Sequence, residues 1–309
     1  MTLSIFFVIL YQDHIYPTNE LSRAYPYLSQ ALQQQTKTYL KNEFNAYFDP
    51  TMYSHIGWAD GAAREALPLP PEVEAARVNF PKIENAGSDW SWTYPQYNLY
   101  AMWKYATIFP VDASRIYDLA KNKLQVPSPA TLDYFTKRPW ELNGYIAGYI
   151  GFLKLQEVAG KTGVDSQLRL TVSNELNRLE ALRSSNFSKD TYYTDLNQGY
   201  THRTLNVARN FIMLVPELGD YLNQNALGKV QAAIDEYNLV GPYWFASRYD
   251  ASIGESATQN LYDYPAMFQA KAYILKESRA ELTKYLDAPA FERGDLFYIQ
   301  NLIAAIEAP

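Results

Sequence analysis

The sequence predicts a mainly α-helical protein whose helices pair into an inner and an outer layer, as in an incomplete (α/α) toroid or a helical solenoid. Apolar residues recur at helical spacing along most of the 309 residues, and strand-like alternation is scarce. From residue 94 onward the helical segments come in pairs whose first member is the more apolar. An irregular helical bundle is the alternative that these two observations leave open.

The first predicted helix covers about residues 24–48, and residues 49–93 then form a long irregular stretch rich in Pro and Gly. Such a long loop is unusual in a compact domain and is often functional. We therefore expect an N-terminal part, residues 1–93, that precedes a paired-helix domain, residues 94–309. The two parts are expected to form one structural unit.

Four helix pairs are predicted in the second part. They cover about residues 95–108 with 113–124, 139–159 with 166–182, 201–215 with 226–237, and 264–275 with 291–306, with a short helix near 278–285. Asp112 is a plausible N-cap, and Gly160 and Gly163 are stop signals. Residues 211–215 are wholly apolar, whereas residues 174–180 carry only a narrow apolar stripe, which favours inner and outer positions respectively.

Composition excludes several classes of protein. A net charge of -6 argues against a nucleic-acid partner, which requires a basic face. With no Cys and only three His, thiolate metal sites, disulfides and multi-histidine sites are not expected, although an oxygen-ligated Ca²⁺ ion is possible. No other cofactor and no bound metal are expected. No apolar run approaches the length of about 18 residues that a membrane-spanning helix requires.

The N-terminal segment from Leu3 to Leu10 is apolar, as in the core of a signal peptide, but no basic residue precedes it and no cleavage site follows. A buried strand or packing segment is the preferred interpretation. An extracellular or cell-surface location is favoured, although this segment is not a convincing signal peptide.

Aromatic and polar residues concentrate where the inner helices begin. Five of the six Trp lie in predicted loops or at these helix starts, and Trp103 alone lies well inside a predicted helix. Aromatic faces pack on the C–H faces of a sugar, and amides and carboxylates bind its hydroxyls. The candidate substrate-binding residues are Trp90, Trp92, Tyr97, Asn98, Trp140, Asn143, Asn206, Trp244, Tyr262 and Asp263.

The arrangement of these segments, over about residues 90–307, resembles the (α/α) toroid proteins that act on polysaccharides, namely polysaccharide lyases and inverting glycosidases. No specific family motif accompanies this architectural resemblance. The resemblance implies binding and cleavage of an extracellular polysaccharide.

Two catalytic constellations are candidates. Tyr200, His202 and Arg203, with Asn206 one turn later, match the base and the carboxylate-neutralising groups that the resemblance implies for a β-eliminating lyase. The alternative is that His202 caps or braces its helix and that Arg203 pairs with Asp195 or Glu217.

The second constellation is a carboxylate pair for inverting hydrolysis. Asp89 and Glu141 are the leading choices, and Asp195, Glu255 and Asp263 are others. Glu141 also suits the first turn of a helix for electrostatic reasons alone. Phosphate-loop, dinucleotide, serine-hydrolase and zincin motifs are absent from the sequence.

Two other functions remain open. A non-catalytic glycan-binding protein would keep the aromatic residues and lack an acid or a base with a perturbed pKa. A self-assembling structural or surface protein would bury Trp244, Tyr262 and the N-terminal segment between subunits, because Tyr and Trp are also enriched in interface cores.

Overall fold

The computed structural model of the chain describes residues 15–47, 96–129, 132, 135–136, 139–187, 209–240, 266–286 and 296–308. These residues are mainly helical, and none of them lies in a β-strand, which confirms the predicted all-α class. The division at residue 93 stays a prediction, because residues 48–95 lie outside the described ranges.

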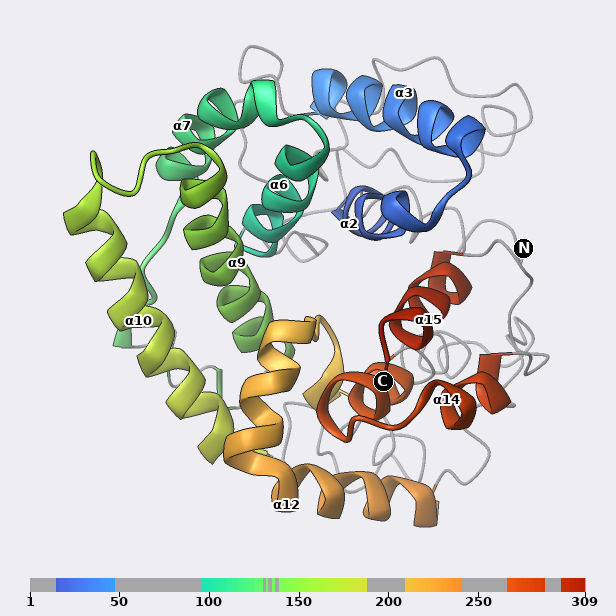
Figure 1. The fold of residues 1–309 in the computed structure, drawn as a ribbon. Helices are drawn as coiled ribbons and strands as arrows, with labels where there is room; N and C mark the ends of the chain where they lie inside the picture. The colour runs from blue at the N-terminus through green and yellow to red at the C-terminus, as the bar shows by residue number, and fades with distance from the viewer. Residues whose placement is uncertain are drawn as a thin grey trace, which may run out of the picture.

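The described helices follow one another around the molecule (Figure 1). The longer ones are α2 (Ile15–Ala24), α3 (Gln30–Tyr47), α6 (Tyr97–Ile108), α7 (Ala113–Lys123), α9 (Pro139–Val158), α10 (Ser166–Ser185), α12 (Pro216–Val240), α14 (Arg279–Leu286) and α15 (Leu296–Glu307). Short helical turns are η1 (Tyr25–Tyr27), η4 (Pro110–Asp112) and η5 (Arg209–Phe211), and η8 (Ala270–Ile274) is a π-helical segment.

Contacts between these helices form a closed circuit. α2 packs on α6, α6 on α9, α9 on α12, α12 on η8, η8 on α15, and α15 returns to α2. α3, α7, α10 and α14 each pack on one or more members of this circuit, and Figure 1 shows them toward the outside of the view. The first and last described helices are therefore in direct contact.

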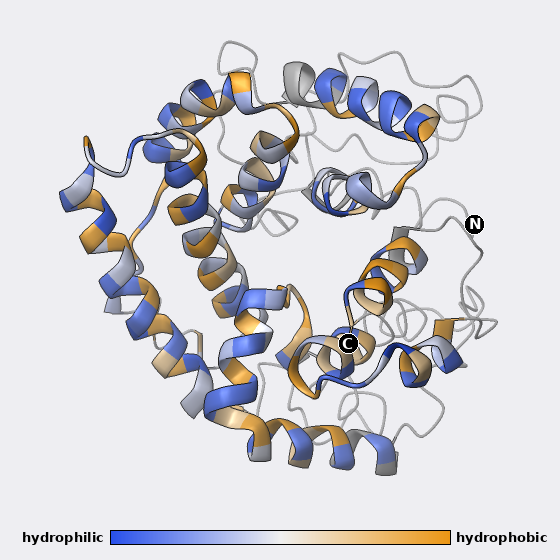
Figure 2. Ribbon diagram, viewed as in Figure 1, coloured by the Kyte–Doolittle hydropathy of each residue, from blue (hydrophilic) through white to orange (hydrophobic). Residues whose placement is uncertain are grey.

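α9 and α10 show how consecutive helices differ. α9 buries fourteen of its 20 residues, whereas α10 buries only Val172, Leu179 and Arg183 of its 20. Figure 2 shows the same contrast as apolar colour on α6, α9 and α15 and more hydrophilic colour on α3, α7 and α10. α6 and α9 are thus more apolar than α7 and α10, which follow them, and the assignment of these helices to an inner and an outer layer stays a prediction.

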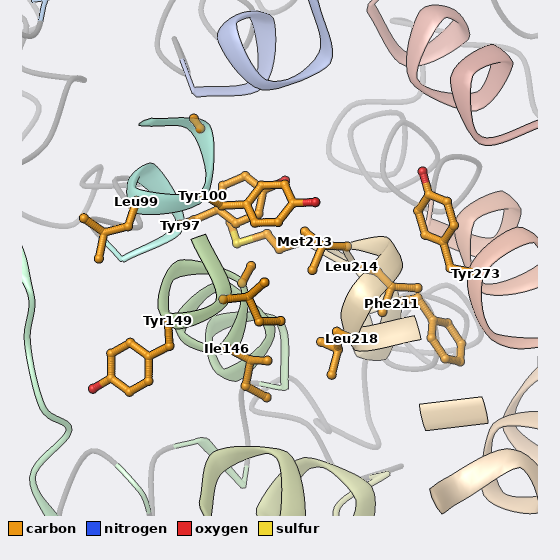
Figure 3. Packing of buried hydrophobic residues seen from close by; sticks show 14 of the residues in the cluster. Tyr97, Leu99, Tyr100, Ile146, Tyr149, Phe211, Met213, Leu214, Leu218 and Tyr273 are labelled. Atoms are coloured by element: carbon orange, nitrogen blue, oxygen red, sulfur yellow. The ribbon is translucent and has the colours of Figure 1, made fainter. Parts of the chain in front are cut away.

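α6 and α9 approach each other closely because α9 carries glycines at the contact. A Cβ atom added at Gly151 would lie 2.4 Å from the Cα of Tyr100, and one added at Gly148 would lie 2.0 Å from the carbonyl oxygen of Gln96. Real side chains do not tolerate such distances. The glycines therefore fix how near α6, with its buried tyrosines, lies to α9 (Figure 3).

Several predicted boundaries were wrong. The helix predicted over about residues 24–48 begins later, as α3 at Gln30, and the helix α2 and the turn η1 that precede α3 were not predicted. Residues 212–215 were predicted to be helical but form a turn and an irregular link, and Met213 in the turn adopts a positive φ of 58°. α12 begins at Pro216, ten residues before the predicted start. Asp112 precedes α7, but its side chain makes no capping hydrogen bond.

Within the part of the chain that the structure describes, no helix has the length and apolar character needed to cross a membrane.

Candidate functional site

Polar side chains from five elements of the helix circuit meet in one group, which we call the Arg23 cluster. Its members are Asn19, Glu20 and Arg23 from α2, Tyr97, Tyr100 and Lys104 from α6, Glu217 from α12, Tyr273 from η8, and Gln300 and Glu307 from α15. Residues up to 284 positions apart in the chain make direct contact here.

Helical spacing explains why each element contributes several residues to this group. Glu20 and Arg23 are three positions apart on α2, so they share one face of the helix and form an ion pair at 3.3 Å. Tyr97, Tyr100 and Lys104 are spaced by three and four positions along α6. Glu217 follows Pro216 in the first turn of α12, where proline suits the backbone and a carboxylate suits the helix dipole.

Arg23 is the most highly bonded member of the cluster. Its side chain is 4 % exposed and donates to Glu20 Oε2, to Glu307 Oε2 at 2.8 Å and to the hydroxyl of Tyr273. Burial alone would lower the pKa of this guanidinium. The partial and full negative charges of Tyr273, Glu20 and Glu307 outweigh burial and hold the pKa well above its ordinary value. Arg23 is thus a permanent cation that ties α2 to η8 and α15.

Glu20 lies beside Arg23 with 1 % of its side chain exposed. Its Oε1 accepts hydrogen bonds from Asn19 at 2.9 Å and from Gln300 at 3.3 Å. Burial has the largest effect on the pKa of Glu20 and raises it, and the charge of Glu307 raises it further. Arg23 and the two amides lower the pKa by a smaller amount, so the pKa stays above its ordinary value. Glu20 therefore holds a proton more readily than an ordinary glutamate.

The outer part of the cluster reaches solvent. The hydroxyl of Tyr100 donates to Glu217 Oε2 at 2.8 Å, and the ammonium of Lys104 lies 3.9 Å from Glu217 Oε1. Lys104 is also 3.8 Å from the centre of the Trp103 ring, a cation–π contact. Burial lowers the pKa of Lys104 by more than Glu217 raises it. Burial, together with the neighbouring Glu217, raises the pKa of Tyr100 well above its ordinary value.

An aromatic series leads along α6 to this outer part. The rings of Tyr97 and Tyr100 are stacked with their centres 6.2 Å apart, and the ring of Trp103 meets Tyr100 edge to face at 5.2 Å. Figure 3 shows Tyr97 and Tyr100 extending side by side from α6, and Tyr273 on the far side of Met213 and Leu214. Tyr97 and Tyr100 are buried, whereas Trp103 is partly exposed.

These groups have definite chemical capacities. Tyr100 stays protonated at neutral pH, and its hydroxyl donates its one hydrogen to Glu217. Glu217 offers carboxylate oxygens close to solvent, and Trp103 offers part of an aromatic ring. A carboxylate acceptor beside an aromatic face is a combination that suits the recognition of a hydroxyl-bearing ring.

A second polar group, the Arg183 network, lies between α9, α10 and the segment that begins with η5. Arg183 is fully buried and donates to Asn143 Oδ1 at 2.7 Å, to the Asn210 carbonyl at 2.6 Å and to the Asn186 carbonyl. Its guanidinium also lies 4.4 Å from the centre of the Phe187 ring. None of these partners is a carboxylate, and burial lowers the pKa of Arg183 to about 9.

The structure describes five of the predicted site residues, and one of them belongs to each of these two regions. Tyr97 belongs to the Arg23 cluster, where its hydroxyl accepts from Asn19 at 3.2 Å. Asn143 belongs to the Arg183 network, and its amide also donates to the carbonyls of Asn210 and Ile212, at 3.0 and 2.8 Å. Asn98 is fully buried on α6, and Trp140 and Glu141 occupy the first turn of α9.

The other predicted site residues lie outside the described ranges. They are Asp89, Trp90, Trp92, Tyr200, His202, Arg203, Asn206, Trp244, Tyr262 and Asp263. Their catalytic and binding roles stay predictions. The same applies to Ca²⁺. The described residues contain no group of three or more His, Cys, Asp or Glu that could hold a metal ion.

Glu20 and Arg23 were not predicted from the sequence, and Glu217 was predicted only as a possible partner of Arg203. The first two precede the predicted start of the N-terminal helix, and Glu217 precedes the predicted start of the helix that became α12. A proline followed by a glutamate is itself a helix-start signal, so Pro216 and Glu217 could have been recognised from the sequence. No comparable signal pairs Arg23 with Tyr273 or Glu307.

Comparisons with known proteins add no relative: no family model, no curated sequence and no solved structure matches this chain.

Proposed function

We propose that this protein binds a polysaccharide and cleaves it, and that the outer part of the Arg23 cluster contributes to the substrate site. The observation that carries the proposal is the grouping of Tyr100, Lys104 and Glu217 beside the partly exposed ring of Trp103. This grouping combines part of an aromatic face with charged groups near solvent, which suits a sugar-binding surface.

The architecture supports the same proposal. A closed circuit of contacts from α2 through α6, α9, α12, η8 and α15 back to α2 is what an (α/α) toroid requires. The burial contrast between α9 and α10 fits an inner and an outer helix. We therefore interpret the fold as an incomplete (α/α) toroid, with His202, Arg203 and Glu141 kept as further candidates for the chemistry.

A screen for turnover tests the function. The full chain would be incubated with a panel of acidic and neutral polysaccharides, and new reducing ends and the absorbance of unsaturated uronates would both be recorded. We expect cleavage of at least one polymer. We also expect Glu217→Gln to lower the rate by about 100-fold or more, the usual contribution of a general acid or base.

Glu281→Gln is the matched control, because Glu281 lies on α14 in an exposed ion pair with Lys284. If neither signal appears with any polymer but glycans still bind, the protein is a binding module. Binding of no glycan would refute the proposal. An unchanged rate for a folded Glu217→Gln protein would remove the Arg23 cluster from the site.

A further inference from the structure

In the Arg23 cluster, the carboxylates of Glu217 and Glu307 are more exposed to solvent than the cations that they pair with. The side chains of Glu217 and Glu307 are 32 % and 29 % exposed, whereas those of Lys104 and Arg23 are 19 % and 4 % exposed. A ligand that approaches from solvent therefore meets acceptor oxygens before it meets positive charge.

Both cations that the described residues contribute to this cluster are also already engaged. Arg23 donates to two carboxylates and to the hydroxyl of Tyr273. Lys104 lies between Glu217 and the Trp103 ring, and Glu307 and Glu20 act on its ammonium as well. A carboxylate on the ligand would have to displace an internal carboxylate from one of these cations, and it would be repelled by Glu217 and Glu307.

We infer that the sugar unit bound against Trp103 is uncharged, so that the substrate is a neutral glycan and the reaction is hydrolysis rather than β-elimination. This inference rests on the proposed function. A neutral sugar can donate a hydroxyl hydrogen to Glu217 while its C–H face packs on the exposed part of Trp103. β-Elimination instead requires a uronate whose carboxylate is neutralised by cations that are free to bind it.

Hydrolysis of a glycosidic bond requires no reactant other than water. Water adds across the glycosidic bond: its hydroxyl group bonds to the anomeric carbon, and the leaving oxygen takes up a proton. The products are a new reducing end and a new hydroxyl group, and no unsaturated sugar forms.

Matched polymers test the inference directly. Uronate polysaccharides of several linkage types would each be paired with their carboxyl-reduced forms, in which each uronate has become a neutral sugar with its linkage unchanged. Binding to the full chain would be measured by titration calorimetry at two salt concentrations, and reducing ends and unsaturated products would be assayed in parallel. We expect a carboxyl-reduced form to bind at least about tenfold more tightly than its uronate parent.

Glu217→Gln should narrow this preference, because it removes one of the two repelling charges, and Glu281→Gln should leave it unchanged. Equal or tighter binding of the uronate forms, or unsaturated products, would overturn the inference while leaving the proposed function intact. If no member of any pair binds, the proposed function fails and the inference fails with it.

Discussion

Arg23 and Arg183 both bury a guanidinium almost completely, yet they do so with different partners. Arg23 faces two carboxylates and a tyrosine hydroxyl, and its pKa is raised. Arg183 faces an amide oxygen and backbone carbonyls, and burial lowers its pKa. Carbonyl partners satisfy the donors without adding titratable groups, whereas carboxylate partners bring several ionisable groups into contact.

This difference indicates that the Arg183 network holds helices together, whereas the Arg23 cluster is a candidate functional site. The Arg183 network joins the end of α10 to α9 and to the segment after η5, and its bonds are internal. The Arg23 cluster joins α2, η8 and α15 and continues through Lys104 and Glu217 to solvent. Mutations at the two arginines should therefore differ in size, in pH dependence and in their effect on activity.

The largest loss of stability is expected from Arg23→Met. Removing the guanidinium leaves Glu20 and Glu307 without their shared cation, and breaking a buried ion pair in this way costs about 3–5 kcal/mol. Urea denaturation at neutral pH would measure the change. A loss below about 1 kcal/mol would mean that the cluster contributes little to holding the first and last described helices together.

Arg183→Met should lower the free energy of unfolding somewhat less, by about 2–3 kcal/mol, because it leaves buried carbonyl oxygens rather than charged groups without a hydrogen-bond donor. The control is Arg178→Met on the same helix. Arg178 forms an exposed ion pair with Glu175, so its loss should cost no more than about 1 kcal/mol. Equal effects of the two substitutions in urea denaturation would contradict the anchoring role of Arg183.

The pH dependence should distinguish the two regions further. The folded-state pKa of Glu20 is raised, so its contribution to stability is complete below its unfolded pKa of about 4.3 and is lost as the pH rises through the folded value. Because glutamine does not ionise, the Glu20→Gln protein should not lose this part of its stability as the pH rises. The wild-type protein should therefore have its greatest advantage over Glu20→Gln near about pH 4, and a smaller one near neutral pH.

Arg183→Met provides the contrast. The partners of Arg183 include no carboxylate, and its pKa of about 9 lies above the range from mildly acidic to neutral pH. The loss of stability in Arg183→Met should therefore be the same throughout that range. Denaturation curves at several pH values would test both expectations. If the loss of stability changed with pH equally in Arg183→Met and Glu20→Gln, the two regions would not differ in pH dependence.

The same two regions show what the sequence could predict. The helices α6, α7, α9 and α10 follow from apolar spacing and stop signals, because these are local properties of the chain. Asn143 was identified as a polar residue near the start of a buried helix, but its partner Arg183 lies 40 positions later. Which buried amide meets which arginine depends on the packing of α9 against α10.

The Arg23 cluster was harder to predict for the same physical reason. Its contacts join residues 250 and 284 positions apart, and such contacts exist only once the helix circuit closes. Trp103 was treated as an ordinary residue inside a helix. The spacing of Tyr97, Tyr100 and Trp103 at every third position does place them along one side of α6, and this local signal could have identified the aromatic series.

The smallest stability effect is expected where the Arg23 cluster reaches solvent. Lys104 and Glu217 are 3.9 Å apart and both partly exposed, so a double-mutant cycle with Lys104→Met and Glu217→Gln should give a coupling energy of no more than about 1 kcal/mol. Urea denaturation of the four proteins measures this coupling. A pair that adds little to stability but whose loss abolishes glycan binding or cleavage is retained for function. A coupling energy of several kcal/mol with unchanged glycan binding would instead show that Lys104 and Glu217 stabilise the fold, as Arg183 is expected to do.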